Sequence, residues 1–300
     1  MKYLLLVIIS TYLMSEPITP IPTTVVVNSQ KVQLGKELFF ETKLSADNTI
    51  SCATCHDLEN GGDDGLMFSI GHNAQKGDIN APTVYNSVYN FRQFWDGRSK
   101  DLKEQAKGPI QNPIEMANSF ENVIKTLNQS PYKQKFKKIY KDAVTEDNIV
   151  DAIAEYEKTL ITPNAPFDKY LKGDKNAISQ AQKEGYELFK DKGCIACHHG
   201  INVGGNLYNK FGLMQEANSD RQGRYDVTKN LQDKYFFKVP SLRNIQHTSP
   251  YLHDGRYENL EDVVKFMARY QLGRTISDEE VNKMVEFLYS LSGEKPKSVR

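Results

Sequence analysis

Apolar residues recur at helical spacing in four segments of the chain, and each segment directly follows a residue that can cap a helix. A Ser, Thr or Asn there accepts a hydrogen bond from the first turn, and Glu or Gln three residues later completes a capping box. The four predicted helices follow Thr145 (burying Ile149, Ile153, Tyr156 and Leu160), Ser179 with Gln182 (ahead of Leu188), Asn259 (carrying Val263, Val264 and Met267, with Gly273 ending the region) and Ser277 with Glu280 (ahead of Val281, Met284, Val285 and Leu288). The pattern predicts a mainly α-helical protein.

Two stretches, residues 57–115 and 199–258, show no clean period and are predicted to be loops. Loops of that length inside a compact domain usually wrap a cofactor or carry function. The segment Ile161–Pro166 is the best linker candidate, because two prolines within four residues stop a helix. A chain of 300 residues is about twice the usual length of one domain, so we expect two domains, 24–163 and 164–300.

The first fifteen residues have the layout of a secretory signal peptide, with Lys2 near the start, an apolar stretch and the small residue Ser15. The apolar stretch of about a dozen residues is short of the roughly 20 that a spanning helix needs. We therefore expect cleavage near Ser15 and a mature protein in the periplasm, without a membrane span. The 38 basic and 38 acidic residues of the whole chain cancel, so bulk charge does not favour a nucleic-acid partner.

The chain contains one unit twice. In the first half, Gly35-Lys36-Glu37-Leu38-Phe39 precedes Cys52-Ala53-Thr54-Cys55-His56 and then Gly61-Gly62. In the second half, Gly185-Tyr186-Glu187-Leu188-Phe189 precedes Cys194-Ile195-Ala196-Cys197-His198 and then Gly204-Gly205. We infer that a short helix leads to a CxxCH motif and a glycine turn once in each half.

In a CxxCH motif the cysteines lie about one helical turn apart, so their sulfurs can form thioethers with two haem vinyl groups while the adjacent His binds the iron. A single CxxC also fits a thioredoxin-type redox pair or half of a zinc site. Here both pairs end in His and no further cysteine remains for a four-thiolate zinc site. The sequence predicts two covalent c-type haems, held by Cys52, Cys55 and His56 and by Cys194, Cys197 and His198, and no disulfide.

Few residues are available as second axial ligands. Met267 lies 69 residues after His198, roughly the interval at which a small c-type cytochrome supplies its axial methionine; the alternative is a core Met. A Met/His pair raises the haem potential, which suits electron entry. His72 and Met116 are both candidates for the first haem. We interpret His199 and His247 as structural or solvated, and His253 as a residue that approaches the second haem.

The segment from 80 to 116 carries the most unusual side chains, among them Trp95, Gln105 and Glu115. Glu115 lies between two apolar residues, where partial desolvation suits a general acid/base near neutral pH; the alternative is a surface Glu beside a buried Met. Trp95 is the only tryptophan, and it is either a core residue or an aromatic bridge between redox centres.

Several stretches together resemble the bacterial di-haem cytochrome c peroxidases, in the same order and over nearly all of the mature chain. The matching stretches are Ser51-Cys52-Ala53-Thr54-Cys55-His56, Ser69-Ile70-Gly71-His72, Asn80-Ala81-Pro82-Thr83, Gln93-Phe94-Trp95-Asp96-Gly97-Arg98, Gln105-Ala106-Lys107-Gly108-Pro109, Gly193-Cys194 to His198, Val239-Pro240-Ser241-Leu242-Arg243-Asn244, and Pro250-Tyr251 with His253.

The resemblance implies a low-potential haem on His56, where peroxide reacts, with His72 as its distal ligand at rest. It makes Glu115 the acid/base, puts Gln105 in the peroxide pocket and Trp95 between the haems. The haem on His198 and Met267 would be the high-potential electron-entry site. The resemblance also implies a calcium ion held by the Asn80 side chain and the carbonyls of Thr248 and Pro250, since oxygen ligands suit that ion.

The activity implied is the reduction of hydrogen peroxide to water with two electrons from a small monohaem cytochrome c or a similar donor. Two redox centres fit such donors, which deliver one electron at a time. Family members are commonly homodimers. We hypothesise that an electron on the Met267 haem triggers a rearrangement of residues 57–115 that removes His72 from the iron. The loss of Lys2 and the gain of four haem propionates would leave the mature protein acidic, which suits a basic donor.

Two other functions compete with the peroxidase. A di-haem electron carrier explains both CxxCH motifs and Met267, but it leaves Trp95, Gln105 and Glu115 without a purpose. The second competitor resembles MauG, the related di-haem enzyme that oxidises side chains of a partner protein. MauG has a tyrosine where this chain has Met267, which argues against that function.

Overall fold

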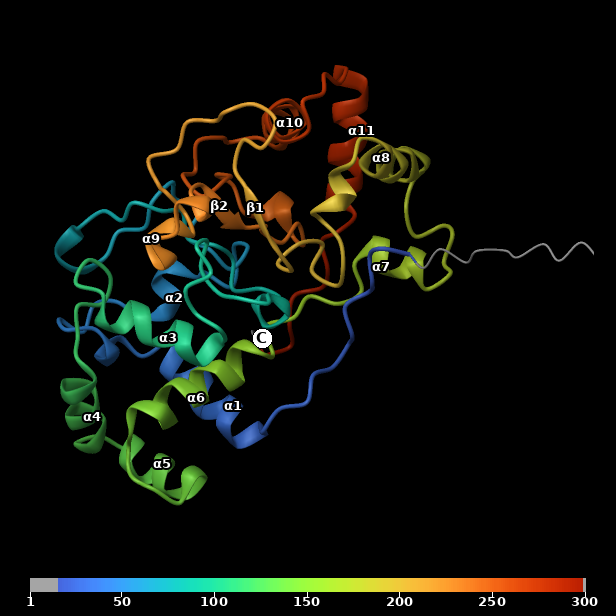
Figure 1. The fold of residues 1–300 in the computed structure, drawn as a ribbon. Coiled ribbons are helices and arrows are strands. Elements are labelled where there is room, and N and C mark those ends of the chain that lie inside the picture. The colour runs from blue at the N-terminus through green and yellow to red at the C-terminus, as the bar shows by residue number, and fades with distance from the viewer. Residues whose placement is uncertain (1–15, 299–300) are drawn as a thin grey trace, which may run out of the picture.

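The structure, a computed structural model, describes residues 16–298, so the predicted signal peptide lies outside the described residues. The N-terminal half contains α1 (Ser29–Phe39), α2 (Cys52–Cys55), α3 (Leu102–Gln111), α4 (Phe120–Asn128), α5 (Tyr132–Tyr140) and α6 (Glu146–Glu157) (Figure 1). The C-terminal half contains α7 (Pro166–Leu171), α8 (Gln180–Asp191), β1 (Tyr208–Lys210), α9 (Tyr225–Thr228), β2 (Phe236–Lys238), α10 (Leu260–Phe266) and α11 (Asp278–Tyr289). The two short strands pair antiparallel, with Tyr208 opposite Lys238. The predicted mainly helical fold is confirmed.

Each half is built on one closely packed helix pair, α1 with α6 and α8 with α11. A methyl group on Gly35 would lie 1.8 Å from the Ala152 carbonyl oxygen, and one on Gly185 would lie 1.9 Å from that of Lys283. The repeated glycine is therefore the point where one helix crosses the backbone of the other. The motif ends with Phe39 against Tyr156 in one pair and Phe189 against Phe287 in the other.

The predicted caps form as expected. Thr145 accepts from the Asn148 N–H at the start of α6, Asn259 accepts from the Asp262 N–H at the start of α10, and both capping boxes are complete. Two ends differ from the prediction. Leu160 lies beyond the end of α6, although it is still buried. Met267 begins a π-helical turn, Met267–Gln271, that directly follows α10.

The prediction of loops was wrong for part of residues 57–115, because α3 lies there. Asp101 caps this helix by accepting from the Glu104 N–H over 2.9 Å, and Leu102, Ala106 and Ile110 line its buried face. Gly and Pro in its last turn, at 108 and 109, conceal the helical period in the sequence. The stretch 199–258 contains only β1, α9, β2 and short 3₁₀ turns.

The segment Ile161–Pro166 connects the two halves but is not a solvated linker. Thr162 is buried, its N–H donates to Asn86, and its hydroxyl accepts from Asn86 and Asn244. Asn86 belongs to the N-terminal half and Asn244 to the C-terminal half, so the crossing is bonded to both. Pro166 is the first residue of α7.

A fully buried ion pair stabilises the C-terminal half. Arg243 donates to the Asp168 carboxylate over 2.6 Å, and both side chains are wholly inaccessible. Arg243 also donates to the carbonyls of Ile201 and Thr19, which connects the N-terminal segment of the chain to this half.

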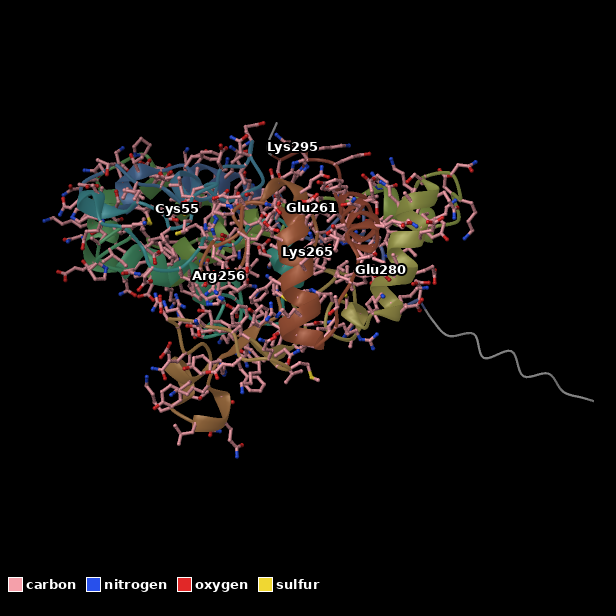
Figure 2. The ribbon with its side chains drawn as sticks, turned by 90° about the horizontal axis from the view of Figure 1, so that it is seen from above. Cys55, Arg256, Glu261, Lys265, Glu280 and Lys295 are labelled. Atoms are coloured by element: carbon pink, nitrogen blue, oxygen red, sulfur yellow. The ribbon has the colours of Figure 1, made fainter. Side chains whose placement is uncertain are left out.

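Seen from above, Cys55 lies in the N-terminal half, with Glu261, Lys265 and Glu280 in the C-terminal half (Figure 2). Among the helices within residues 16–298, none is both long and apolar enough to cross a membrane.

Candidate functional site

The first CxxCH motif forms α2 and ends on His56, whose ring is held by the glycine turn that follows it. His56 Nδ1 lies 3.2 Å from the Gly62 carbonyl oxygen, and because a carbonyl only accepts, Nδ1 carries the proton. Gly62 reaches this position with φ +79°, which suits a residue without Cβ. The bond fixes the tautomer and leaves Nε2 as the nitrogen available to iron.

The second motif repeats this arrangement. His198 Nδ1 lies 3.4 Å from the Val203 carbonyl oxygen, next to the positive-φ pair Gly204 and Gly205. Burial lowers the pKa of His198 to about 4 and also lowers that of His56, so both imidazoles are neutral at neutral pH. Neutral imidazole is the form that binds a metal. Each half therefore holds one histidine prepared as an iron ligand.

The cysteines of these motifs lack the environment of a redox pair. Burial raises the pKa of Cys55 and of Cys194 to about 11, and it raises that of Cys52 still further. A reactive thiol pair needs a depressed thiol pKa, so the thioredoxin-type alternative is disfavoured. Groups of three or more His, Cys, Asp or Glu side chains able to hold a metal do not occur between residues 16 and 298.

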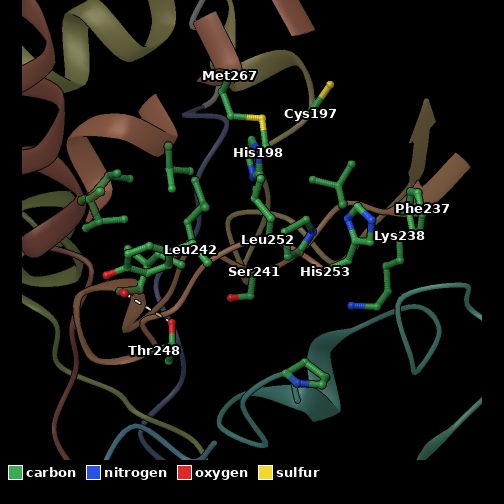
Figure 3. Close-up of a pocket in the computed structure, with 18 of the residues that line it drawn as sticks. Cys197, His198, Phe237, Lys238, Ser241, Leu242, Thr248, Leu252, His253 and Met267 are labelled. Atoms are coloured by element: carbon green, nitrogen blue, oxygen red, sulfur yellow. Dashed lines mark hydrogen bonds between the residues drawn. The ribbon is translucent and has the colours of Figure 1, made fainter. Parts of the chain in front are cut away.

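The second motif opens into a largely apolar pocket, the second pocket, which Met267 lines. Figure 3 shows Met267, His198 and Cys197 at one end of this pocket and Lys238 and Thr248 at the other. The pocket fits a haem attached at the cysteine end, with His198 and Met267 both on its lining. Helix α10 and the π-helical turn after it carry Met267 to this position.

Aromatic rings fill the side of this pocket that faces the N-terminal half. His253 is buried, stacks on Phe237 at 4.3 Å between ring centroids, and lies 6.1 Å from the Trp95 ring. Its Nε2 lies 2.9 Å from the Ser219 hydroxyl. His253 thus lines the second pocket, whereas His199 contacts Asn206 and His247 is exposed beside Gln246.

Lys238 is a functional candidate that the sequence analysis missed. It lines the second pocket, is only 5 % exposed, and forms no ion pair with any acid in the described chain. Burial lowers its pKa to about 8. Lys238 lies on the side of the pocket away from Cys197, where it would place a positive charge beside a bound haem (Figure 3). The signal was available in the sequence, since this lysine is surrounded by Phe236, Phe237 and Val239.

The first motif opens into a separate pocket, the first pocket, and Gln105 and Glu115 both line it. Gln105 comes from α3, and Glu115 from the segment directly after this helix. Asn112 donates to Glu115 Oε1 over 2.6 Å. Burial raises the pKa of Glu115, and the Asn112 hydrogen bond offsets part of that effect. The structure therefore brings together the predicted acid/base and its predicted neighbour.

Of the two candidates for the second axial position of this pocket, Met116 lines it and His72 does not in the described structure. Met116 is buried in the N-terminal core. His72 points away, and its Nδ1 lies 2.9 Å from the Asp47 carboxylate. A hydrogen bond from Thr49 lowers the pKa of Asp47 to about 2. Asp47 keeps its charge beside His72, and nothing in the sequence pattern had connected these two residues.

Glu157 is a further buried acid that the sequence analysis missed. It ends α6, lines the first pocket, and its Oε2 has no hydrogen-bond partner within residues 16–298. Burial raises its pKa to about 8, so the carboxyl group is protonated at neutral pH. Its spacing from Ile153 puts it on the apolar face of the helix, which is the signal that could have found it.

Trp95 lines both pockets. Its indole N–H donates to the Asn80 carbonyl oxygen over 2.9 Å, and its own carbonyl accepts from the Lys238 N–H. Asn80 is buried, and its side-chain amide donates to Leu66. Asn80, Thr248 and Pro250, the residues predicted to hold calcium, lie along one pocket between the halves.

These features define a di-haem c-type protein: two similar halves, each with a CxxCH motif, a neutral histidine, and a largely apolar pocket that this histidine lines. A family model described as di-haem cytochrome c peroxidase matches residues 29–176, and one described as cytochrome c matches residues 182–292. The chain belongs to the bacterial di-haem cytochrome c peroxidase family. The predicted family and the predicted pair of covalent c-type haems are thereby confirmed.

The curated relatives are similar over most of the chain. Cytochrome c551 peroxidase of Nitrosomonas europaea is 51% identical over 286 residues, which cover 94% of this chain and 86% of that protein. Cytochrome c peroxidase Ccp of Escherichia coli is 49% identical over 286 residues, 93% of this chain and 62% of that protein. Methylamine utilization protein MauG of Methylorubrum extorquens is more distant, at 32% identity over 93% of this chain and 80% of that protein.

Among solved structures, a MauG-like protein associated with microbial copper homeostasis has a TM-score of 0.80 at 23% identity, covering 95% of this chain and 96% of that one. The diheme peroxidase BthA of Burkholderia thailandensis has a TM-score of 0.79 at 19% identity, covering 90% and 87%. At these identities the likeness concerns the fold alone.

Proposed function

We propose that this protein is a cytochrome c peroxidase, which reduces hydrogen peroxide to two molecules of water with two electrons and two protons. The observation that carries the proposal is Glu115, a buried carboxyl group held by Asn112 on the pocket of the first CxxCH motif. An electron carrier has no use for an acid in that position. The similarity to named cytochrome c peroxidases supports the same reaction and a cytochrome c donor.

The chain contributes proton movement and positioning. When bound, the first haem would supply the iron at which peroxide is reduced. Cleavage of the O–O bond requires a proton to pass from the near oxygen to the departing one, and Glu115 can accept it and then donate it. Because burial raises its pKa, the carboxyl group binds and releases a proton closer to neutral pH. The Gln105 amide lines the same pocket and can orient the peroxide.

We assign Trp95 to electron transfer between the halves, because it lies on both pockets and is anchored at its indole nitrogen. Trp95→Phe keeps a ring in place and Trp95→Leu removes it. We expect electron transfer between the haems, measured by flash photolysis or stopped flow, to slow more in the leucine variant. Equal rates in both variants and in the wild type would contradict the assignment.

We propose that Met267 would be the second protein ligand of the iron on the His198 side, and that His72 would be that of the iron on the His56 side, only at rest. Figure 3 and the shared pocket support Met267. For His72, the hydrogen bond to Asp47 supports a second position away from the pocket, which would open the site to peroxide. In this scheme, an electron arriving at the site of His198 and Met267 would favour the position in which His72 is bonded to Asp47.

The experiment that tests the function is peroxide-dependent oxidation of reduced cytochrome c by the wild type, Glu115→Gln and Glu104→Gln. Glu104 is an exposed acid on α3 and serves as the matched control. We expect Glu115→Gln to lose about 10²- to 10⁴-fold in rate with both haems still bound, and Glu104→Gln to lose little. An inactive wild type would favour the electron carrier, and a fully active Glu115→Gln would remove Glu115 from the mechanism.

Four further features are part of the proposal: a periplasmic location after cleavage near Ser15, domains at 24–163 and 164–300, a homodimer, and a calcium ion at Asn80, Thr248 and Pro250. The signal-peptide pattern supports the location. The two helix pairs support the domains. The resemblance supports the dimer and the calcium ion. Cell fractionation, sedimentation and metal analysis test the location, the dimer and the ion respectively.

A further inference from the structure

Asp63 is a buried acid that the proposed mechanism does not use. Asp63 is 3 % exposed, and its Oδ1 has no hydrogen-bond partner within residues 16–298. It forms no ion pair with a lysine or arginine there, and its charged neighbours include the acids Asp57 and Asp64. The backbone N–H groups of Asp63 and Gly65 offset only part of the effect of burial on the pKa of this carboxyl group, and burying a carboxylate without a paired cation is unfavourable. A bound cation would balance the charge of this acid.

The carboxylate faces the opposite half of the molecule. A methyl group on Gly61 would lie 2.3 Å from the His247 carbonyl oxygen and 3.2 Å from Asp63 Oδ1. A methyl group on Gly65 would lie 4.0 Å from the Ser249 carbonyl oxygen. Asp63 therefore lies directly against the segment 247–250, in which residues Thr248 and Pro250 are the predicted carbonyl ligands of calcium.

The loop that contains Asp63 and Leu66 also contacts Asn80, the third predicted ligand. The Asn80 side-chain N–H donates to the Leu66 carbonyl oxygen over 2.9 Å, which orients the amide and leaves Oδ1 on its other side as an oxygen donor. The Asn80 N–H donates to the His253 carbonyl oxygen of the opposite half. Asp63, Asn80, Thr248 and Pro250 all line one pocket. Loop and segment together offer oxygen atoms from both halves.

We propose that Asp63 supplies the negatively charged ligand, directly or through one water, of a divalent cation held by Asn80 Oδ1 and the carbonyl oxygens of Thr248 and Pro250. The inference rests on the calcium site proposed above and adds its only anionic donor. Calcium takes six to eight oxygen ligands, and its affinity rises with the charge of the set. Without Asp63 these ligands are all neutral.

Asp63 then makes the junction between the halves depend on the cation. Asp63 and Asn80 come from the N-terminal half, and the two carbonyls come from the C-terminal half. A cation that binds only the folded junction stabilises the protein by an amount that grows with its free concentration. The acid also keeps the trapped charge balanced beside apolar haem pockets, where an unpaired cation would be as unfavourable as an unpaired acid.

The test uses the di-haem holoenzyme, depleted of metal and then titrated with Ca²⁺ alone, with bound metal counted by mass spectrometry and affinity measured by calorimetry. The variants are Asp63→Asn and, as control, Asp64→Asn, whose acid is partly exposed and caps the Leu66 N–H. We expect Asp63→Asn to bind Ca²⁺ about tenfold more weakly or worse, and Asp64→Asn to bind like the wild type. Asp63→Ser provides the same comparison with a smaller side chain.

A second measurement separates a ligand from a structural acid. The thermal midpoint of the wild type should rise with Ca²⁺, and that of Asp63→Asn should rise less. Without metal, Asp63→Asn should unfold at the same temperature or higher, because an uncharged amide replaces an unpaired acid. Unchanged Ca²⁺ affinity in Asp63→Asn would overturn the role of Asp63 alone. If the wild type binds no Ca²⁺, the calcium site itself is refuted, and peroxide turnover then shows whether the peroxidase proposal still stands.

Discussion

The backbone N–H of His72 donates a hydrogen bond to the carbonyl oxygen of Glu115 over 2.8 Å. Gly71 permits the approach, since a methyl group there would lie 2.0 Å from the Ile114 carbonyl oxygen. Asn73 and Ala74 follow with φ of 55° and 57°, a backbone region that residues other than glycine rarely adopt. The segments of the proposed removable ligand and the proposed acid therefore share one backbone hydrogen bond, so a movement of the His72 backbone would disturb the segment that positions Glu115.

The contact between His72 and Asp47 holds the loop in this arrangement, and its loss should favour the ligated position. In Asp47→Ala we expect the high-spin fraction of the first haem after one-electron reduction to fall severalfold, because the position of His72 away from the pocket loses its hydrogen-bond partner. Electron paramagnetic resonance measures this fraction. Thr49→Val removes another Asp47 contact but keeps the partner of His72. Equal losses in both variants would assign the effect to general disorder of the loop.

The pH dependence of turnover should respond to Asn112. Burial raises the pKa of Glu115 and the Asn112 hydrogen bond lowers it, so Asn112→Ala should raise the pKa further. If Glu115 reacts as the carboxylate, activity is present above this pKa and disappears as pH falls through it. The acid limb of kcat/KM therefore moves to higher pH in Asn112→Ala. Asn118→Ala, which loses a bond to the Leu44 carbonyl, should leave the limb in place.

Local patterns were sufficient to predict several helices and the two haem motifs. The caps at Thr145 and Ser277 are made within four residues of chain, and each CxxCH motif is five residues long, so a sequence contains both completely. The Gly35 and Gly185 repeat was visible for the same reason. The reason for that glycine was not, because the backbone that it approaches lies about a hundred residues further along the chain.

What the sequence analysis missed depends on contacts between distant segments. His72 reaches Asp47 across 25 residues, and Arg243 reaches Asp168 across 75. No periodicity connects such pairs, since the fold alone decides which segments meet. Lys238 and Glu157 are different, because each is a charge within an apolar pattern, and such a conflict between local and global preference marks a functional position. Helix α3 was missed because its last turn contains Gly108 and Pro109.

Lys238 gives a prediction for the potential of the second haem. A buried positive charge stabilises the reduced state, so its removal in Lys238→Met should lower the potential by on the order of 50 mV, close to a tenfold change in the equilibrium constant of a one-electron couple. A spectroscopic redox titration measures the shift. Lys234→Met removes a half-buried lysine from the same region and should leave the potential unchanged. A lowered potential in both variants would indicate a general effect of lost positive charge instead of an effect of the buried position of Lys238.

The repeated glycine of the two helix pairs gives a prediction whose sign is decisive. In an unobstructed helix, Gly→Ala stabilises by about 1 kcal/mol, because alanine loses less conformational freedom on folding. In Gly185→Ala the added methyl would lie 1.9 Å from the Lys283 carbonyl oxygen and 3.0 Å from Phe287 Cβ, so α8 and α11 must separate. Overpacking of this kind costs about 1–3 kcal/mol, and the obstacle here is backbone, which cannot rotate away.

We therefore expect Gly185→Ala to lower the free energy of unfolding, and Gly35→Ala, whose methyl would meet the Ala152 carbonyl oxygen, to do the same. Gly77, which lies outside the helices, is the control, because its φ is not positive and a methyl there would lie 3.4 Å from the Ser69 carbonyl oxygen, an ordinary contact. Urea unfolding followed by circular dichroism gives the three values. If Gly185→Ala proved as stable as Gly77→Ala, the close crossing of α8 and α11 would not be the reason for the glycine in the repeat.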